Sequence, residues 1–179
     1  MALYVVAYPR FAAADARWIE DLRRRHDPQA GRLGAHVTLV FAARGVAVAA
    51  AADHLRAVAA ATPPFAVDFT EVALRRGHDG ESCYAYLLPA RGGDALRALH
   101  AALNQDPFAR SEHLAFEPHV TLGSSAEPGA LSGLVARCSA PPPDVRAEIA
   151  ALHLLGVDGA DLTDLASAPL GQASITGRP

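Results

Sequence analysis

The chain has 179 residues, a formal net charge of −3, and 51% apolar and 20% charged residues, an ordinary composition for a soluble globular protein. All 16 basic side chains are arginine, so lysine-based covalent chemistry is excluded. The acidic balance disfavours broad attachment to a nucleic-acid backbone, which needs a basic surface. A local basic pocket could still hold the phosphate of a small nucleotide or of an RNA terminus.

The amino-terminal stretch carries no recognisable targeting signal. It has neither a basic n-region nor an A-x-A cleavage site, and no run approaches the ~18 apolar residues that a membrane span needs. Cys83 and Cys138 lack C-x-x-C spacing and are expected to be free thiols in a reducing compartment. We therefore expect a cytoplasmic protein with no membrane association and no obligate protein partner.

The first half of the chain predicts three strands that alternate with two helices. Prolines end the first strand and precede the third, an Asp-Pro pair stops the first helix, and the second helix is rich in alanine. A turn rich in glycine follows the third strand. The expected strands are 4–9, 34–41 and 65–74, the expected helices are 12–28 and 46–61, and the turn is 75–82.

The second half predicts the same series. Leu96, Leu99 and Leu103 recur at helical spacing, and Asp94 is a candidate to cap their helix. A second Asp-Pro pair follows at Asp106-Pro107. The expected strands are 84–89, 117–124 and 145–155, the expected helices are 92–107 and 128–138, and a last short strand is expected at 161–171.

The two halves are related by several matched landmarks. "YVVAYP" at 4–9 resembles "YAYLLP" at 84–89, and the letters HVTL occur at 36–39 and again at 119–122, 83 positions later. This agreement predicts a duplicated α+β fold of two similar lobes related by an approximate two-fold axis, with one HVTL motif from each lobe at a small site on that axis. The whole chain would be one domain with two pseudo-symmetric lobes, from sequence repeats at about 1–78 and 80–179.

Each HVTL motif combines an acid/base group with a hydroxyl on one face of a strand. Side chains two positions apart on a strand share a face, so His36 lies beside Thr38 and His119 beside Thr121. One neutral imidazole could take a proton from an attacking water while the other, protonated, gives one to the leaving oxygen. The threonine hydroxyls could hold the non-bridging oxygens of a phosphate.

Two alternatives remain open at this point. The histidines could be metal ligands, although the pattern is not typical of a metal site: Glu117 stands two positions before His119 and has no counterpart before His36. The pairs could also form a binding module that recognises a nucleotide or RNA end without turnover. We expect neither a metal nor another cofactor.

The paired motifs resemble those of the 2H phosphoesterase superfamily, which includes 2′-5′ RNA ligase-like proteins and cyclic nucleotide phosphodiesterases. The context F-x-P-H-V-T-L at 116–122 is similar to the bacterial branch. The resemblance implies a bilobal α+β fold in which two antiparallel sheets with outer helices line a central cleft. It also implies metal-independent hydrolysis, or reversible ligation, of cyclic or 2′-linked phosphates. It implies acid/base roles for His36 and His119 and phosphate binding by Thr38 and Thr121.

Several other side chains are candidates to line the cleft. Phe41 should face the core unless its strand bulges, in which case it could stack on a base. Trp18 is expected in the core, and the basic run 23–26 is expected to complement the dipole of its helix. The remaining candidates are Tyr4, Tyr84 and Tyr86 from the strands, His113 near the second motif, and Arg10, Arg44 and Arg110 as phosphate contacts.

Overall fold

The computed structural model describes residues 1–77, 80–108, 116–127 and 129–172, which form an α+β fold with two antiparallel sheets. The four-stranded sheet has the order β3-β1-β8-β9, from β1 (Ala2–Ala7), β3 (Val37–Ala43), β8 (Ala151–Asp158) and β9 (Asp161–Pro169). The five-stranded sheet has the order β2-β7-β4-β5-β6, from β2 (Arg10–Phe11), β4 (Phe65–Arg76), β5 (Cys83–Arg91), β6 (Val120–Ser125) and β7 (Val145–Ile149). The helices are α1 (Ala13–His26), α2 (Val48–Ala61), α3 (Gly93–Leu103) and α4 (Ser132–Cys138).

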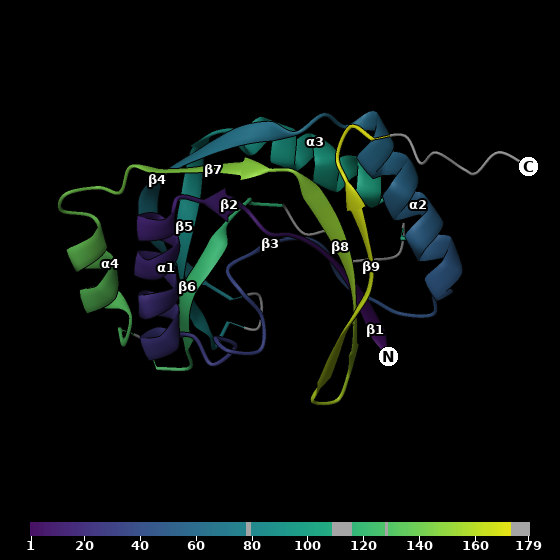
Figure 1. Ribbon diagram of the computed structural model, residues 1–179. Helices are drawn as coiled ribbons and strands as arrows, with labels where there is room; N and C mark the ends of the chain where they lie inside the picture. The colour runs from purple at the N-terminus through teal and green to yellow at the C-terminus, as the bar shows by residue number, and fades with distance from the viewer. Residues whose placement is uncertain (78–79, 109–115, 128, 173–179) are drawn as a thin grey trace, which may run out of the picture.

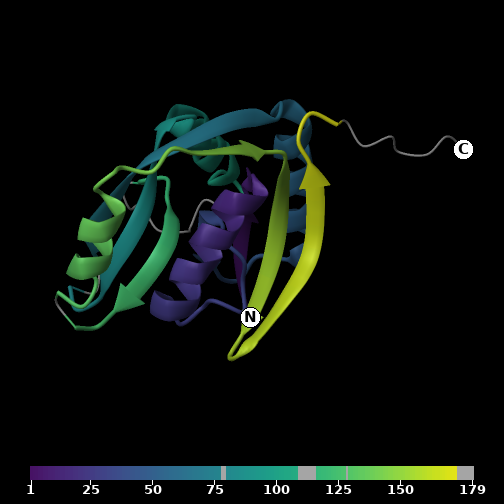
Figure 2. The same cartoon turned by 60° about the vertical axis from the view of Figure 1, so that its left-hand side comes forward.

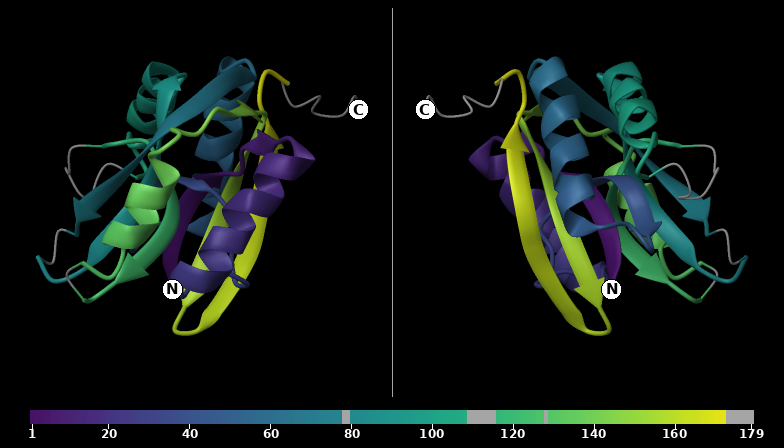
Figure 3. Two further views of the ribbon diagram at one scale, coloured as in Figure 1. Left: turned by 90° about the vertical axis from the view of Figure 1, so that its left-hand side faces the viewer. Right: turned by 90° about the vertical axis from the view of Figure 1, so that its right-hand side faces the viewer.

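The two sheets form the sides of an arch, with β4 and β7 near its top (Figure 1). Helix α4 flanks the five-stranded sheet, whereas α2 lies against β8 and β9 of the four-stranded sheet (Figures 1 and 3). Helix α1 packs on β6 at the edge of the five-stranded sheet (Figures 1 and 2). None of the described helices is long and apolar enough to cross a membrane.

The apolar periodicity of the sequence correctly predicted which helix faces are buried. Leu96, Leu99 and Leu103 of α3 are all buried, and Trp18 of α1 packs against the core as expected. Asp94 lies in the first turn of α3, but it does not cap the helix and pairs with Arg97. The helix starts after Gly92, where φ is 80° and an added Cβ atom would come within 2.5 Å of the Ala66 carbonyl oxygen, so the position requires glycine.

Each sheet takes strands from both halves of the chain. Both halves contain a strand, a helix, the motif strand, a second helix and a further strand, with β2 added in the first half and β8 and β9 in the second. Strand β4 pairs with β5 rather than with β1, and β8 pairs with β1 rather than with β5. Strand β4 therefore joins the sheet of β5 and β6, and β8 and β9 join the sheet of β1 and β3. The division of the chain into two lobes from the sequence repeats 1–78 and 80–179 stays a prediction. Each of the two sheets contains strands from both repeats.

The predicted single strand at 145–155 is two strands in different sheets. Val145, Ala147 and Ile149 are buried at odd positions of β7, whereas Leu152 and Leu154 are buried at even positions of β8. The alternation changes phase at Ala150, where the chain leaves the five-stranded sheet and enters the four-stranded sheet. The short strand β2 was also not predicted, and the helix expected at 128–138 begins only at Ser132.

Both HVTL motifs contain a β-bulge at the same letter. Thr38 pairs with Val6 and Val40 with Val5, so Leu39 is an extra residue in β3. Thr121 pairs with Tyr86 and Gly123 with Ala85, so Leu122 is the extra residue in β6. A bulge turns the side chains that follow it to the opposite face, and it often occurs beside active sites.

Candidate active site

The two motif histidines lie close together, one before each of the strands β3 and β6. A positive charge on His36 disfavours protonation of His119, so the two imidazoles are within electrostatic reach of each other. Both side chains are half-buried, as are Thr38 and Thr121 two positions further on. The fold thus brings together the two histidines, with a threonine two positions after each.

Each histidine is held in the same way by the backbone two residues before it. Nδ1 of His36 lies 2.8 Å from the Gly34 carbonyl oxygen, and Nδ1 of His119 lies 2.7 Å from the Glu117 carbonyl oxygen. A carbonyl oxygen only accepts, so Nδ1 carries the proton in both rings. The neutral imidazoles therefore have an unprotonated Nε2, the atom that can take up and later release a proton.

The segment before His36 is fixed by a buried arginine. Arg23 is 1% exposed and donates to Asp27, Glu20 and the Leu33 carbonyl oxygen, the last at 2.7 Å. Glu20 also accepts from the backbone N–H of Ala35 at 2.7 Å. The run 23–26 lies in the last turn of α1, as expected for a complement to the helix dipole, but Arg23 has a further task that the sequence did not predict. This side chain ties α1 to the loop that supports His36.

The segment before His119 is fixed by Tyr86 and by a second ion pair. The Tyr86 ring stacks on the imidazole with centroids 3.5 Å apart and planes 11° apart. Arg75 of β4 donates from Nε and Nη2 to the two carboxylate oxygens of Glu117, both at 2.8 Å. Tyr84, two positions before Tyr86, lies on the same face of β5, and the two ring centroids are 5.6 Å apart.

Burial keeps both histidines neutral in the free protein. The pKa of His119 is lowered to about 4, mainly by desolvation and also by the charges of His36 and Arg75, against the opposing hydrogen bond and charge of Glu117. Desolvation is also the main cause that lowers the pKa of His36. Burial raises the pKa of Tyr86 to about 12, so its phenol stays protonated.

The depressed pKa of His119 should make folding less stable in acid. Between pH 6.5 and about 4 the unfolded chain binds a proton at this residue that the folded protein does not, so the free energy of unfolding falls as the pH falls. The loss should reach roughly 3 kcal/mol at most below pH 4. Urea unfolding at pH 7, 5.5 and 4 should show a smaller acid loss in His119→Gln, and an equal loss would contradict this.

A further polar group lies on the four-stranded sheet beside His36. The Tyr8 ring lies edge-on to His36, with centroids 6.4 Å apart, and to His153 of β8, with centroids 4.8 Å apart. Nδ1 of His153 lies 3.1 Å from a carboxylate oxygen of Asp164 in β9. Burial is the main cause that raises the pKa of Tyr8. Sequence reasoning did not select Tyr8, His153 or Asp164.

Phe41 is exposed because its strand bulges. The extra residue at Leu39 reverses the alternation, so Val40 is buried and Phe41 is 60% exposed. The Tyr4 ring supports it edge-on, with centroids 5.2 Å apart. Ala42 next to it has a φ of 48°, which is unusual for a residue other than glycine. An exposed aromatic face on the strand of the first motif is thus available for stacking.

Helix α3 links the two motifs. The carbonyl oxygen of the bulged Leu39 accepts from Nδ1 of His100 at 2.7 Å and from Asn104 at 2.9 Å. Phe116, three positions before His119, stacks on His100 with centroids 4.0 Å apart. His100 is half-buried, and these contacts give it a structural task.

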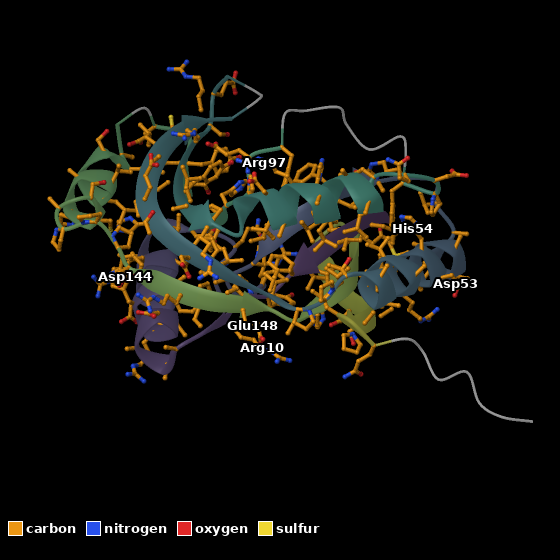
Figure 4. All side chains as sticks on the ribbon, turned by 90° about the horizontal axis from the view of Figure 1, so that it is seen from above. Arg10, Asp53, His54, Arg97, Asp144 and Glu148 are labelled. Carbon is orange, nitrogen blue, oxygen red and sulfur yellow. The ribbon has the colours of Figure 1, made fainter. Side chains whose placement is uncertain are left out.

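The arginines chosen from the sequence do not surround the histidines in the described structure. Arg10 lies in β2 rather than beyond a strand end, and it pairs with Glu148 of β7 (Figure 4). Arg44 is exposed at the end of β3 opposite to His36, about 25 Å along an extended strand. Arg110 and His113 lie outside the described residues.

The arginines beside the histidines are Arg23 and Arg75, and each left a weak signal in the sequence. Arg23 is four positions after Ile19 on the buried stripe of α1, with Glu20 and Asp27 three before and four after it. Arg75 lay in a segment read as a turn, although β4 extends to Arg76. Among the described residues, no group of three or more His, Cys, Asp or Glu could hold a metal ion, and Cys83 and Cys138 are buried free thiols.

Comparisons with known proteins show the family of this chain and agree with its fold. The family model described as the 2′-5′ RNA ligase superfamily matches residues 11–161. E. coli LigT, solved with ATP, is similar in structure with a TM-score of 0.62 and 20% identity, over 96% of this chain and 98% of LigT. A structure described as a phosphoesterase has a TM-score of 0.63 and 22% identity, over 96% and 99% of the two chains. Kluyveromyces marxianus Usb1 has a TM-score of 0.59 and 9% identity, over 94% and 97%. No curated protein is significantly similar in sequence.

Proposed function

The chain belongs to the 2′-5′ RNA ligase superfamily of phosphoesterases and RNA ligase-like enzymes, and from this premise we propose that it is a metal-independent phosphodiesterase. Its substrates would be 2′,3′-cyclic phosphates or 2′-5′ phosphodiester linkages of nucleotides or RNA ends. The observation that carries the proposal is the matched pair of histidines. Each donates Nδ1–H to the carbonyl oxygen two residues before it, so each imidazole keeps Nε2 for proton transfer.

The reaction needs one proton taken and one proton given. One neutral histidine accepts a proton from water through Nε2 as the water oxygen bonds to phosphorus. The other histidine, as imidazolium, donates its proton to the ribose oxygen as the old P–O bond breaks. The two transfers balance, and each is typically worth about 10²–10⁴-fold in rate. The hydroxyls of Thr38 and Thr121 would donate to the non-bridging oxygens, where negative charge accumulates.

Binding of the anionic substrate would favour protonation of one of the two histidines. Both histidines have a lowered pKa in the free protein, so they are neutral near pH 7. An anionic phosphodiester beside two imidazoles raises the pKa of both, because a nearby opposite charge favours the protonated form. The bound substrate therefore favours the singly protonated pair that the mechanism requires.

The net charge of the chain and an exposed aromatic ring near the site favour a small nucleotide or an RNA end as the substrate. E. coli LigT has been solved with ATP and with 3′-AMP, and Kluyveromyces marxianus Usb1 with uridine monophosphate. In the present chain, the exposed Phe41 ring could stack on a nucleobase about 10 Å along the strand from Thr38. The net charge of −3 favours a small nucleotide or an RNA terminus over long RNA.

The proposal is tested by turnover in the presence of EDTA. We expect hydrolysis of 2′,3′-cyclic mononucleotides or of a 2′-5′-linked dinucleotide, with the 3′-5′-linked dinucleotide as the matched control. The plot of kcat/KM against pH should be bell-shaped with its maximum below pH 6.5, because the pKa of each histidine in the free protein is lowered.

Strict dependence on an added metal, or a plateau from pH 5 to 9, would overturn this mechanism. Tight binding of a 2′-nucleotide by calorimetry, with no product after long incubation, would support a binding module instead. Joining of RNA ends that carry a cyclic phosphate, without net hydrolysis, would assign the ligase direction.

A further inference from the structure

The backbone that holds each catalytic histidine is itself held by an arginine–glutamate pair. For His36, Arg23 donates to the Leu33 carbonyl oxygen and Glu20 accepts from the Ala35 N–H, on either side of Gly34. For His119, the supporting carbonyl belongs to Glu117 itself, whose carboxylate is bound by Arg75. Helix α1 and strand β4, which are far apart in the sequence, thus each supply an arginine that helps to fix the backbone before one of the two histidines.

The two pairs differ in their exposure to solvent. Arg23 is 1% exposed, whereas the Arg75 side chain is 37% exposed and that of Glu117 43%. Arg75 lies opposite Tyr84 in the β4–β5 register, and Tyr84 shares a face of β5 with Tyr86, which stacks on His119. The Arg75–Glu117 pair is therefore on the face of the five-stranded sheet that presents His119, where it remains open to solvent.

We propose that Arg75 is a positioning residue for His119 and acts through Glu117. The ion pair holds Glu117 in place, the Glu117 carbonyl oxygen orients the imidazole through Nδ1–H, and Tyr86 covers the ring face. This inference rests on the proposed two-histidine reaction, because it assigns a task within it.

The geometry favours positioning over direct phosphate binding. The Nε and Nη2 atoms of Arg75 both donate to Glu117, and Nη1 donates to the Leu74 carbonyl oxygen. This bidentate pairing uses the side of the guanidinium that would otherwise clamp a phosphate. A substrate contact would require that the pair open first.

Kinetics separate the two roles. Arg75→Met and Glu117→Gln should each lower kcat by about 10- to 100-fold, as misplacement of a catalytic group does, while KM changes by less than about threefold. The double variant should be no worse than the poorer single variant, because both changes release the same segment. Arg91→Met, which removes an Arg–Asp68 pair elsewhere in the same sheet, should retain wild-type kcat.

A histidine titration followed by NMR tests the pair without turnover. Among the described residues, the titratable groups that act on or contact His119 are Glu117, Arg75, His36 and Tyr86. Loss of the Arg75 charge should raise the pKa of His119, and loss of the Glu117 charge should lower it. A structural disturbance alone would not move the pKa in opposite directions. The double variant should titrate close to the wild type.

Three results would overturn the proposal. They are a raised KM with unchanged kcat in Arg75→Met, an equal loss of kcat in Arg91→Met, and shifts of the His119 pKa in the same direction in both single variants. If the wild-type protein turns over no phosphodiester, the proposed function fails. The opposite pKa shifts would still show that Arg75 and Glu117 act on His119.

Discussion

His36→Ala and His119→Ala are each expected to lower kcat by about 10²–10⁴-fold, because each variant removes one proton transfer at phosphorus. The double variant should lose much less than the product of the two factors, since the histidines act as a unit in one step. Steady-state hydrolysis of a 2′,3′-cyclic mononucleotide measures both effects. KM should change little, because the threonines that would hold the phosphate remain.

His54→Gln provides the matched control. His54 lies on α2 (Figure 4), where its Nε2 binds the Leu103 carbonyl oxygen, and it has no part in the proposed site. Its kcat should equal that of the wild type. Unchanged turnover in either motif variant would contradict the two-histidine mechanism, provided that circular dichroism and the Tm show a folded protein.

Arg23→Met is expected to destabilise the protein by about 3–5 kcal/mol, the usual cost of removing one partner from a buried ion pair. The change removes the Arg23 N–H groups that donate to Oδ2 of Asp27 and to the Leu33 carbonyl oxygen. The lost side chain is 1% exposed in the wild type, so water cannot readily replace it. Urea unfolding measures the loss, provided that the dependence of the free energy of unfolding on urea concentration is the same in the variant and the wild type. In any folded fraction, kcat should fall as well, because the loop before His36 loses its anchor.

Arg24→Met is the control for Arg23→Met. Arg24 is the next residue of the same helix, but it is exposed and pairs with Asp21 on the surface. Exposed pairs contribute about 0–1 kcal/mol, so this variant should unfold close to the wild type. Equal destabilisation by the two variants would contradict a special role for Arg23 and would favour a shared effect of the cationic run on the helix dipole.

The motif residues were readable from the sequence because local periodicity determines them. Alternation on a strand predicts that His36 shares a face with Thr38 and His119 with Thr121. The threonines lie on β3 and β6 of the two-sheet α+β fold, and each histidine stands directly before its strand. The α3 leucines were found by the same reasoning at helical spacing. Each of these features depends on neighbours within a few positions.

Features that depend on long-range pairing were missed or misjudged. Whether Phe41 faces the core or solvent depends on the bulge at Leu39, which arises only when β3 pairs with β1. The segment 145–155 divides between two sheets because β7 and β8 have partners from different parts of the chain. Arg10 was a candidate phosphate contact, but in the folded protein it pairs with Glu148 of the neighbouring strand.

The sequence alone thus determined the family, the general fold and the four residues of the paired motifs, since these follow from short patterns that are written twice. Only the tertiary structure decided how the histidines are held and which arginines support them. Arg23 and Arg75 reach their histidines through contacts that the spacing of residues along the chain does not encode. Burial, which lowers the pKa of His36 and His119, is likewise a property of the assembled fold.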